Sequence, residues 1–176
     1  MAAGDGNGWV QCRCGHRHWG LFGAAGLLLV RSEPAGRRTG DPTTSVLLQL
    51  RAVWTHHGGT WGLPGGARDS HEDAATAALR EAHEETDVPP RDVHVLATVV
   101  TTDHVDWTYE AVVGVPAGPV SPHAVTRESE AVRWVAVDEV DELPLHPGFQ
   151  ASWAELRECV SLAAGPAAAV RDPHPR

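Results

Sequence analysis

Three glutamates, Glu81, Glu84 and Glu85, have the spacing that brings carboxylates to one side of a helix. At about 100° per residue they fall within an arc of about 100°. Side chains three and four residues apart lie about 5–6 Å from each other, so these like charges repel. A divalent cation would relieve the repulsion, and oxygen ligands favour a hard ion such as Mg²⁺ or Mn²⁺, which commonly takes phosphate oxygens as further ligands. The alternative interpretation is a solvated acidic helix face. A second arc, roughly 120° away, holds small apolar residues: Ala75, Ala78, Leu79 and Ala82.

The flanking residues extend this cluster into a longer pattern. The chain matches G-x5-E-x7-R-E-U-x-E-E-x-G-U, in which U is apolar, at Gly66, Glu72, Arg80, Glu81, Ala82, Glu84, Glu85 and Val88. This stretch resembles the Nudix box of the Nudix hydrolases. The resemblance implies a loop-helix-loop in which the carbonyl of Gly66 and the carboxylates of Glu81, Glu84 and Glu85 bind Mg²⁺ or Mn²⁺. It also implies that Glu72 and Arg80 pair to fix the loop against the helix.

The ends of the predicted helix follow from the residues that flank it. Asp73 is the expected N-cap, which leaves Glu72 just outside the helix and within reach of Arg80. Asp87 stands where the family pattern has glycine. Aspartate tolerates the left-handed conformation that ends many helices, so we expect an intact site and a loss of about 1 kcal/mol of stability.

Length and composition predict one domain and limit its partners. The chain has 176 residues, of which 42% are hydrophobic, and a net charge of −9, which disfavours binding to a nucleic-acid duplex or an anionic membrane. The longest apolar run, Leu21 to Val30, is too short to span a bilayer, and the first eight residues lack the features of a secretion signal. Three sparse cysteines favour a reducing cytoplasm.

The predicted elements give an α/β protein, and the Nudix resemblance implies an α/β/α sandwich with a mixed sheet between helices. We expect an N-terminal extension at residues 1–20, a Nudix domain at 21–163 and a disordered tail at 164–176, with a loop at 33–42. Predicted strands are 21–31, 44–51, 61–63, 92–101, 105–115 and 131–137, with a tight turn at 102–104. A C-terminal helix at 150–162 places Trp153, Leu156 and Val160 on one face.

The N-terminal extension has its own candidate metal ligands. Cys12, Cys14, His16 and His18 are zinc-ligand types, but four donors within seven residues are crowded around one tetrahedral ion. The crowding favours the alternative, an extended segment, disordered at its start, with surface histidines and incidental cysteines.

Other candidate site residues lie beyond the box. Trp107 and Tyr109 share a strand face and could stack on a nucleobase, although a core role is equally consistent with the pattern. A general base could come from the box glutamates or from a loop carboxylate. Glu128 is slightly favoured over Glu130 by position, and the alternative for both is a solvated loop carboxylate.

These residues favour a divalent-metal-dependent pyrophosphohydrolase that cleaves the diphosphate of a nucleoside triphosphate or a similar nucleoside-diphosphate-X. They do not indicate an oligomeric state. Family signatures for ADP-ribose, dinucleoside polyphosphates and coenzyme A are missing, which leaves a resemblance to the MutT-like group, including enzymes for oxidised purine nucleotides. The purine-reading asparagine of that group is also missing, since Asn7 is the only asparagine. A noncatalytic nucleotide-sensing Nudix module is the alternative. An isoprenoid diphosphate isomerase is a third reading, for which Cys159 is a poor acid-base residue.

Overall fold

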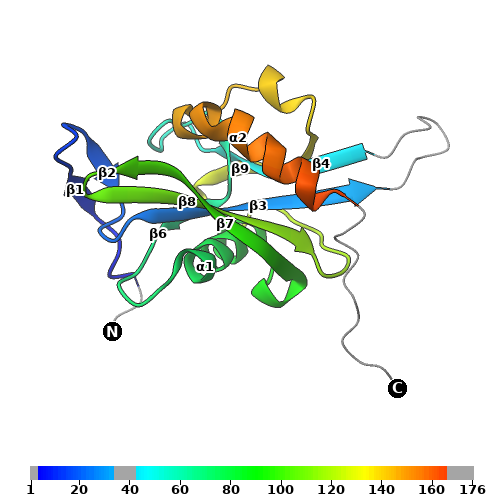
Figure 1. The fold of residues 1–176 in the computed structure, drawn as a ribbon, viewed down its shortest axis with the longest axis horizontal. Helices are drawn as coiled ribbons and strands as arrows, with labels where there is room; N and C mark the ends of the chain where they lie inside the picture. The colour runs from blue at the N-terminus through cyan, green and yellow to red at the C-terminus, as the bar shows by residue number, and fades with distance from the viewer. Residues whose placement is uncertain (1–3, 34–42, 166–176) are drawn as a thin grey trace.

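A computed structural model describes residues 4–33 and 43–165 (Figure 1). The expected loop at 33–42 and tail at 164–176 therefore lie largely outside the described residues. The elements, in chain order, are β1 (Trp9–Gln11), β2 (Arg17–Trp19), β3 (Ala24–Glu33), β4 (Thr43–Arg51), β5 (Trp61–Gly62), β6 (Gly65–Ala67), α1 (Ala74–Thr86), the 3₁₀ turn η1 (Pro90–Asp92), β7 (Val93–His104), β8 (Trp107–Pro116), β9 (Ser129–Ala136), the 3₁₀ turn η2 (Val140–Glu142) and α2 (Pro147–Ala163).

Seven strands form one mixed sheet with the order β5-β4-β3-β8-β7, in which β6 also pairs with β3 and β9 with β4. The β3–β8 pair is parallel and the other pairs of this sheet are antiparallel. Helix α1 covers one face and α2 the other (Figure 1). The expected α/β/α sandwich with a mixed sheet is confirmed.

Strand β3 organises both halves of the core because its first seven residues are buried. Ala25, Leu27 and Leu29 pack with the alanines of α1, whereas Leu28 and Val30 belong to the cluster beneath α2. Alternate residues of a strand point to opposite faces, so a run that is apolar throughout is typical of a strand covered on both sides. Trp153, Leu156 and Val160 bury the predicted face of α2.

Strand β3 also changes partner along its length. Ala24 to Gly26 pair with β6, and Val30 to Glu33 pair with β4. Strands β3 and β4 are therefore paired at one end only, and β6, which carries the start of the box, lies beside β3 at the other. This divergence places the glycine loop and α1 at an end of the sheet that β4 leaves open.

Several predicted bounds of the elements are wrong. The strand expected at 21–31 runs from Ala24 to Glu33, and the strand expected at 61–63 ends at Gly62. The β7–β8 turn lies at Val105–Asp106 and not at 102–104, because the strand continues through its threonines with two register shifts. Strand β9 begins at Ser129, so Glu130 lies inside it. Helix α2 begins at Pro147, a residue that suits the first turn, after His146 accepts a hydrogen bond from the Gly148 N–H at 3.1 Å.

The N-terminal segment forms structure of its own in place of an extended lead-in. Strands β1 and β2 pair as an antiparallel hairpin beside the β7–β8 turn (Figure 1). Asp69, just after β6, accepts hydrogen bonds from the backbone N–H groups of Gly4 and Gly6 at 2.7 and 2.8 Å. Within the described residues, no helix is long and apolar enough to cross a membrane.

Candidate metal centre

The ends of α1 are fixed by the residues expected to cap it. Asp73 accepts a hydrogen bond from the Thr76 N–H at 2.7 Å, and Asp87 adopts a left-handed conformation with φ of 57° while its N–H bonds to the His83 carbonyl. Burial of Ala74, Ala77, Ala78 and Ala82 then fixes the rotation of the helix against the sheet. The glutamates of the opposite arc are thereby directed toward the glycine loop.

Arg80 ties the loop to the helix. Its guanidinium donates to both carboxylate oxygens of Glu72, at 2.7 and 2.8 Å, and to the Ala67 carbonyl at 2.9 Å. The hydrogen bonds from Arg80 hold the pKa of Glu72 below its ordinary value. The structure thus brings together the two residues expected to support the site, and a bidentate pair of this kind fixes direction as well as distance.

Gly66 and Glu81 are in direct contact across the loop. A β-carbon at position 66 would lie 2.6 Å from the Glu81 carboxyl carbon, so a larger residue would displace the carboxylate. Burial raises the pKa of Glu81, and the charge of Glu84 raises it further, whereas the hydrogen bond from Arg80 at 2.7 Å opposes the rise. The close approach that glycine allows therefore places the Glu81 carboxylate against the loop backbone.

Glu85 is the most deeply buried carboxylate of the three, with 7% of its surface exposed. Burial raises its pKa to about 7, while contacts with Gln49 and the Gly65 N–H oppose the rise. Gly65 donates to its Oε2 at 2.9 Å. A carboxyl with a pKa near neutral can exchange a proton at physiological pH, as catalytic acids and bases do.

Gln49 and Ser129 are site neighbours that sequence reasoning missed. Gln49 is buried on β4 and donates to the Ser129 hydroxyl at 2.6 Å, and it also contacts Glu85. The available signal was an amide within the apolar run Val46–Leu50 of β4, because buried polar side chains need partners. Its partner on β9 could not be read from the sequence.

Glu84 is exposed, and its carboxylate lies 3.7 Å from the Arg80 guanidinium. The three box carboxylates do not gather as tightly as the spacing suggested: in the described part of the chain, no cluster of three with ligand atoms within 4.8 Å includes them. Repulsion among the carboxylates and the attraction of Arg80 account for this arrangement.

The donor set nevertheless fits a hard divalent ion. Glu81 and Glu85 both lie against the Gly65–Gly66 backbone. They are close enough for the charge of Glu81 to add to the rise in the pKa of Glu85 that burial causes. All the side-chain donors are carboxylate oxygens, which Mg²⁺ and Mn²⁺ prefer. Rotation of exposed Glu84 would complete the set.

The loop before β9 is attached to the end of α1 by its backbone. The Val125 N–H donates to the Glu85 carbonyl at 3.1 Å, and the His123 N–H donates to the Thr86 carbonyl at 3.0 Å. The side chains of Glu128 and Glu130 are both exposed. Within the described residues, no group of three candidate metal ligands with ligand atoms within 4.8 Å of one another contains Glu128.

Trp107 and Tyr109 have separate environments although they share a strand face. The Trp107 indole stacks on His18 with ring centroids 4.6 Å apart, and its N–H donates to the Trp19 carbonyl at 3.0 Å. Trp107 therefore contacts the N-terminal hairpin. Burial raises the pKa of Tyr109, and the charge of Glu85 adds to the rise, which places the phenol on the Glu85 side of the strand.

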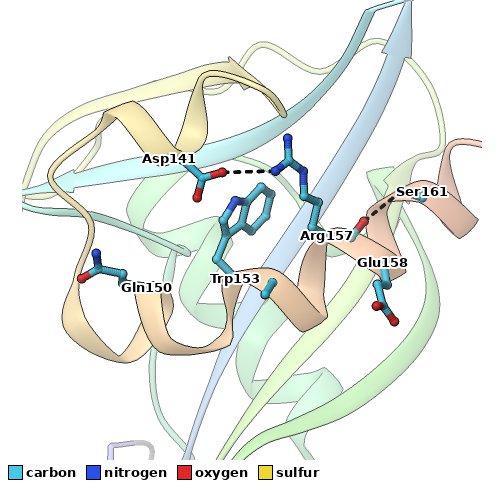
Figure 2. A pocket seen from close by; sticks show the side chains of 7 residues that line it. Asp141, Gln150, Trp153, Arg157, Glu158 and Ser161 are labelled. Carbon is cyan, nitrogen blue, oxygen red and sulfur yellow. Dashed lines mark hydrogen bonds and ion pairs between the residues drawn. The ribbon is translucent and has the colours of Figure 1, made fainter.

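A groove lies on the other face of the sheet, beside α2, and shares no residue with this centre. Asp141, Gln150, Trp153, Ala154, Arg157, Glu158 and Ser161 line it, on α2 and η2 (Figure 2). An ion pair of 3.2 Å between Arg157 and Asp141 crosses it, and none of its lining residues belongs to the box. The candidate chemistry therefore stays with α1 and the glycine loop.

Comparison with known proteins gives consistent matches. A family model described as "NUDIX domain" matches residues 23–156. A Mycobacterium tuberculosis protein named "Putative 8-oxo-dGTP diphosphatase 3" is 52% identical over 159 residues, which cover 88% of this chain and 70% of that protein. A Bifidobacterium longum "Nucleoside triphosphate pyrophosphatase/Nudix hydrolase fusion protein" is 39% identical over 150 residues, covering 84% of this chain and 30% of that protein.

Solved structures agree with the fold. The crystal structure of a Nudix hydrolase from M. smegmatis, RenU, superposes with a TM-score of 0.80 at 48% identity, covering 89% of this chain and 96% of that one. A C. elegans Ap4A hydrolase, at 17% identity and a TM-score of 0.61, covers 78% of this chain and 98% of its own and shares the fold alone.

Proposed function

The chain belongs to the Nudix hydrolase family, and on this premise we propose that it is a divalent-metal-dependent pyrophosphohydrolase of nucleoside triphosphates or similar nucleoside-diphosphate-X substrates. The observation that carries the proposal is a pair of carboxylates, half-buried Glu81 and buried Glu85, that lie against the backbone of the Gly65–Gly66 loop. Two such carboxylates beside an exposed third are suited to hold an ion that in turn holds a phosphate chain.

The Gly66 carbonyl and the carboxylates of Glu81, Glu84 and Glu85 would bind the Mg²⁺ or Mn²⁺ ion. When bound, the ion would place positive charge beside the diphosphate. It would also lower the pKa of a bound water, so that hydroxide is available to attack phosphorus near neutral pH. Arg80 acts through position: by holding Glu72 and the Ala67 carbonyl, it keeps the glycine loop at a fixed distance from the helix. The Gly65 N–H orients the Glu85 carboxylate.

Two carboxylates are candidates for the proton acceptor in the attack of water on phosphorus. Glu85 is supported by its burial beside the Gly65 N–H, at the place where the ion and the attacking water would bind. Glu128 is supported by the attachment of its loop to the end of α1, from which its exposed side chain could turn toward a bound substrate. A base carried on a loop would reach the site once substrate is present.

We further propose a purine nucleoside triphosphate, including an oxidised purine such as 8-oxo-dGTP, as the substrate. The support is the 52% identity to the M. tuberculosis protein whose name carries that activity. In this proposal Tyr109, on the Glu85 side of β8, would contact the substrate, and Trp107 would contribute from the edge of the hairpin.

A substrate panel tests the proposal. Purified protein with Mg²⁺ or Mn²⁺ should release pyrophosphate, not phosphate, from nucleoside triphosphates, with a higher kcat/KM for 8-oxo-dGTP than for dGTP. Glu84→Gln and Glu85→Gln should each lower kcat by orders of magnitude, whereas Glu155→Gln on the exposed face of α2 should leave it unchanged. Full activity in both box variants would refute the metal centre, and phosphate release would refute the cleavage position.

The role of Glu128 has its own test. If Glu128 is the base, Glu128→Gln should lower kcat at least about a hundredfold and remove the acidic limb of the pH–rate profile. If Glu85 is the base, Glu128→Gln should keep that limb with little loss of rate. Glu130→Gln, a neighbouring exposed carboxylate on β9, is the matched control.

A further inference from the structure

The turn of the N-terminal hairpin gathers three side chains that are chemically unlike the box. Cys12, Cys14 and His18 place their ligand atoms within 4.8 Å of one another, and Cys14 Sγ lies 3.1 Å from His18 Nε2. His16, the fourth candidate in the sequence, lies on the exposed turn outside this group. The crowding that argued against a four-ligand site is therefore resolved, because only three donors converge.

We propose that Cys12, Cys14 and His18 bind one Zn²⁺ ion, with a water molecule as the fourth ligand. Two thiolates and an imidazole are soft to borderline donors that favour zinc over the hard ions suited to the box. Zn–S and Zn–N bonds of about 2.3 and 2.0–2.1 Å in tetrahedral geometry require donor atoms about 3.6–3.8 Å apart. The Cys14 Sγ–His18 Nε2 distance of 3.1 Å would lengthen by about 0.5 Å, and the other donor pairs, all within 4.8 Å, would shorten by at most about 1 Å.

The backbone of the turn holds the ligand residues close together without a metal. The Cys12 N–H donates to the His16 carbonyl at 3.0 Å and the Gly15 N–H donates to the Cys12 carbonyl at 3.0 Å, with Gly15 at φ of 93°. Only glycine adopts that φ without strain. The turn directs both cysteines to one side, and the pairing of Val10 with His18 brings the imidazole from β2 to the same place.

The surroundings hold the ligands in place. The Cys14 N–H donates to Cys12 Sγ at 3.4 Å, so this sulfur is oriented by the turn itself. The His18 ring stacks on both His104 and Trp107, with ring centroids 4.6 Å away in each case, so its orientation is fixed.

A metal at this turn would hold the hairpin turn to β2, because all three ligands lie within the hairpin. Arg13, between the two cysteines, forms a bidentate pair with Asp106 in the β7–β8 turn, with a shortest contact of 2.6 Å. That ion pair joins the hairpin to the tip of β7–β8, and the segment before the hairpin contacts Asp69 beside the box loop. A site with an open fourth position exchanges its metal more readily than a closed structural site.

Cobalt spectroscopy of the full chain tests this site separately from the box. With thiols reduced and carboxylates saturated by excess Mg²⁺, Co²⁺ should produce a thiolate-to-metal charge-transfer band in the near ultraviolet that saturates at one equivalent and disappears when Zn²⁺ is added. Carboxylate-bound cobalt gives no such band, so failure of the proposed hydrolase activity would not affect the result. Absence of the band from the wild-type protein overturns the proposal.

Variants identify the ligands. Cys14→Ser and His18→Gln should weaken Co²⁺ binding at least about a hundredfold, since loss of a direct ligand exceeds the effect of losing a neighbour of a ligand. Cys159→Ser, on α2, and His16→Gln should keep the band. Zinc should also protect two of the three thiols from modification in the wild-type protein. A band lost only in Cys159→Ser, or three equally reactive thiols with zinc present, contradicts the proposed site.

Discussion

The buried carboxylate of Glu85, which we propose as a metal ligand, should lower the stability of the metal-free protein at neutral pH. Its carboxyl is buried, and burial raises its pKa from an ordinary 4.5 to about 7. The unfolded chain therefore loses this proton at lower pH than the folded protein does. Between those two values, the native state loses stability as the pH rises, and the loss is complete above pH 7.

The magnitude follows from the two pKa values. A gap from 4.5 to about 7 corresponds to about 3 kcal/mol at about 1.4 kcal/mol for each pKa unit. Glu85→Gln removes the titration and keeps an oxygen that can accept the hydrogen bond from Gly65. The metal-free variant should be more stable than the wild type by about 3 kcal/mol at pH 8 and by about 1 kcal/mol at pH 5.

Denaturant unfolding in the presence of a chelator measures this difference at the two pH values. The comparison between pH 8 and pH 5, about 2 kcal/mol, matters most because other contacts of the new glutamine cancel from it. Glu84→Gln is the control, since Glu84 is exposed and should show no such dependence. Two results would refute the claim that burial of the charged Glu85 carboxylate destabilises the folded protein. One is a Glu85→Gln variant less stable than the wild type at pH 8, and the other is an equal increase in the free energy of unfolding at both pH values.

Three further predictions concern the same helix. Millimolar Mg²⁺ or Mn²⁺ should raise the Tm of the wild-type protein, because the ion binds only where folding has assembled the carboxylates, and a scan unchanged by either ion would count against the metal centre. Glu72→Gln should lower the free energy of unfolding by about 2 kcal/mol, because it removes one partner of a mostly buried ion pair with Arg80; an unchanged denaturation midpoint would contradict this role. Asp87→Gly should raise the free energy of unfolding by about 1 kcal/mol, because glycine adopts the φ of 57° without strain; a loss of stability would show that the aspartate side chain contributes more than its backbone costs.

Local features were predictable because short-range geometry decides them. The caps of α1 at Asp73 and Asp87, the pairing of Glu72 with Arg80 and the apolar face of α2 all depend on residues within about ten positions of each other. The buried strands were predictable in position but not in their ends. Strand β7 runs on to His104 and β9 starts at Ser129, because pairing with neighbouring strands extends them.

The sequence by itself determined the family pattern and the direction of the acidic face, since a helical repeat and two caps suffice for both. Only the tertiary structure decided which glutamate is buried. Glu85 meets Gln49 and the Gly65 N–H because β4, β6 and α1 converge at the end where β3 and β4 separate. The position of Trp107 against the hairpin and the stacking of His18 on His104 and Trp107 likewise depend on contacts between segments more than 80 residues apart in the chain. Such contacts arise from packing between layers, which no local spacing encodes.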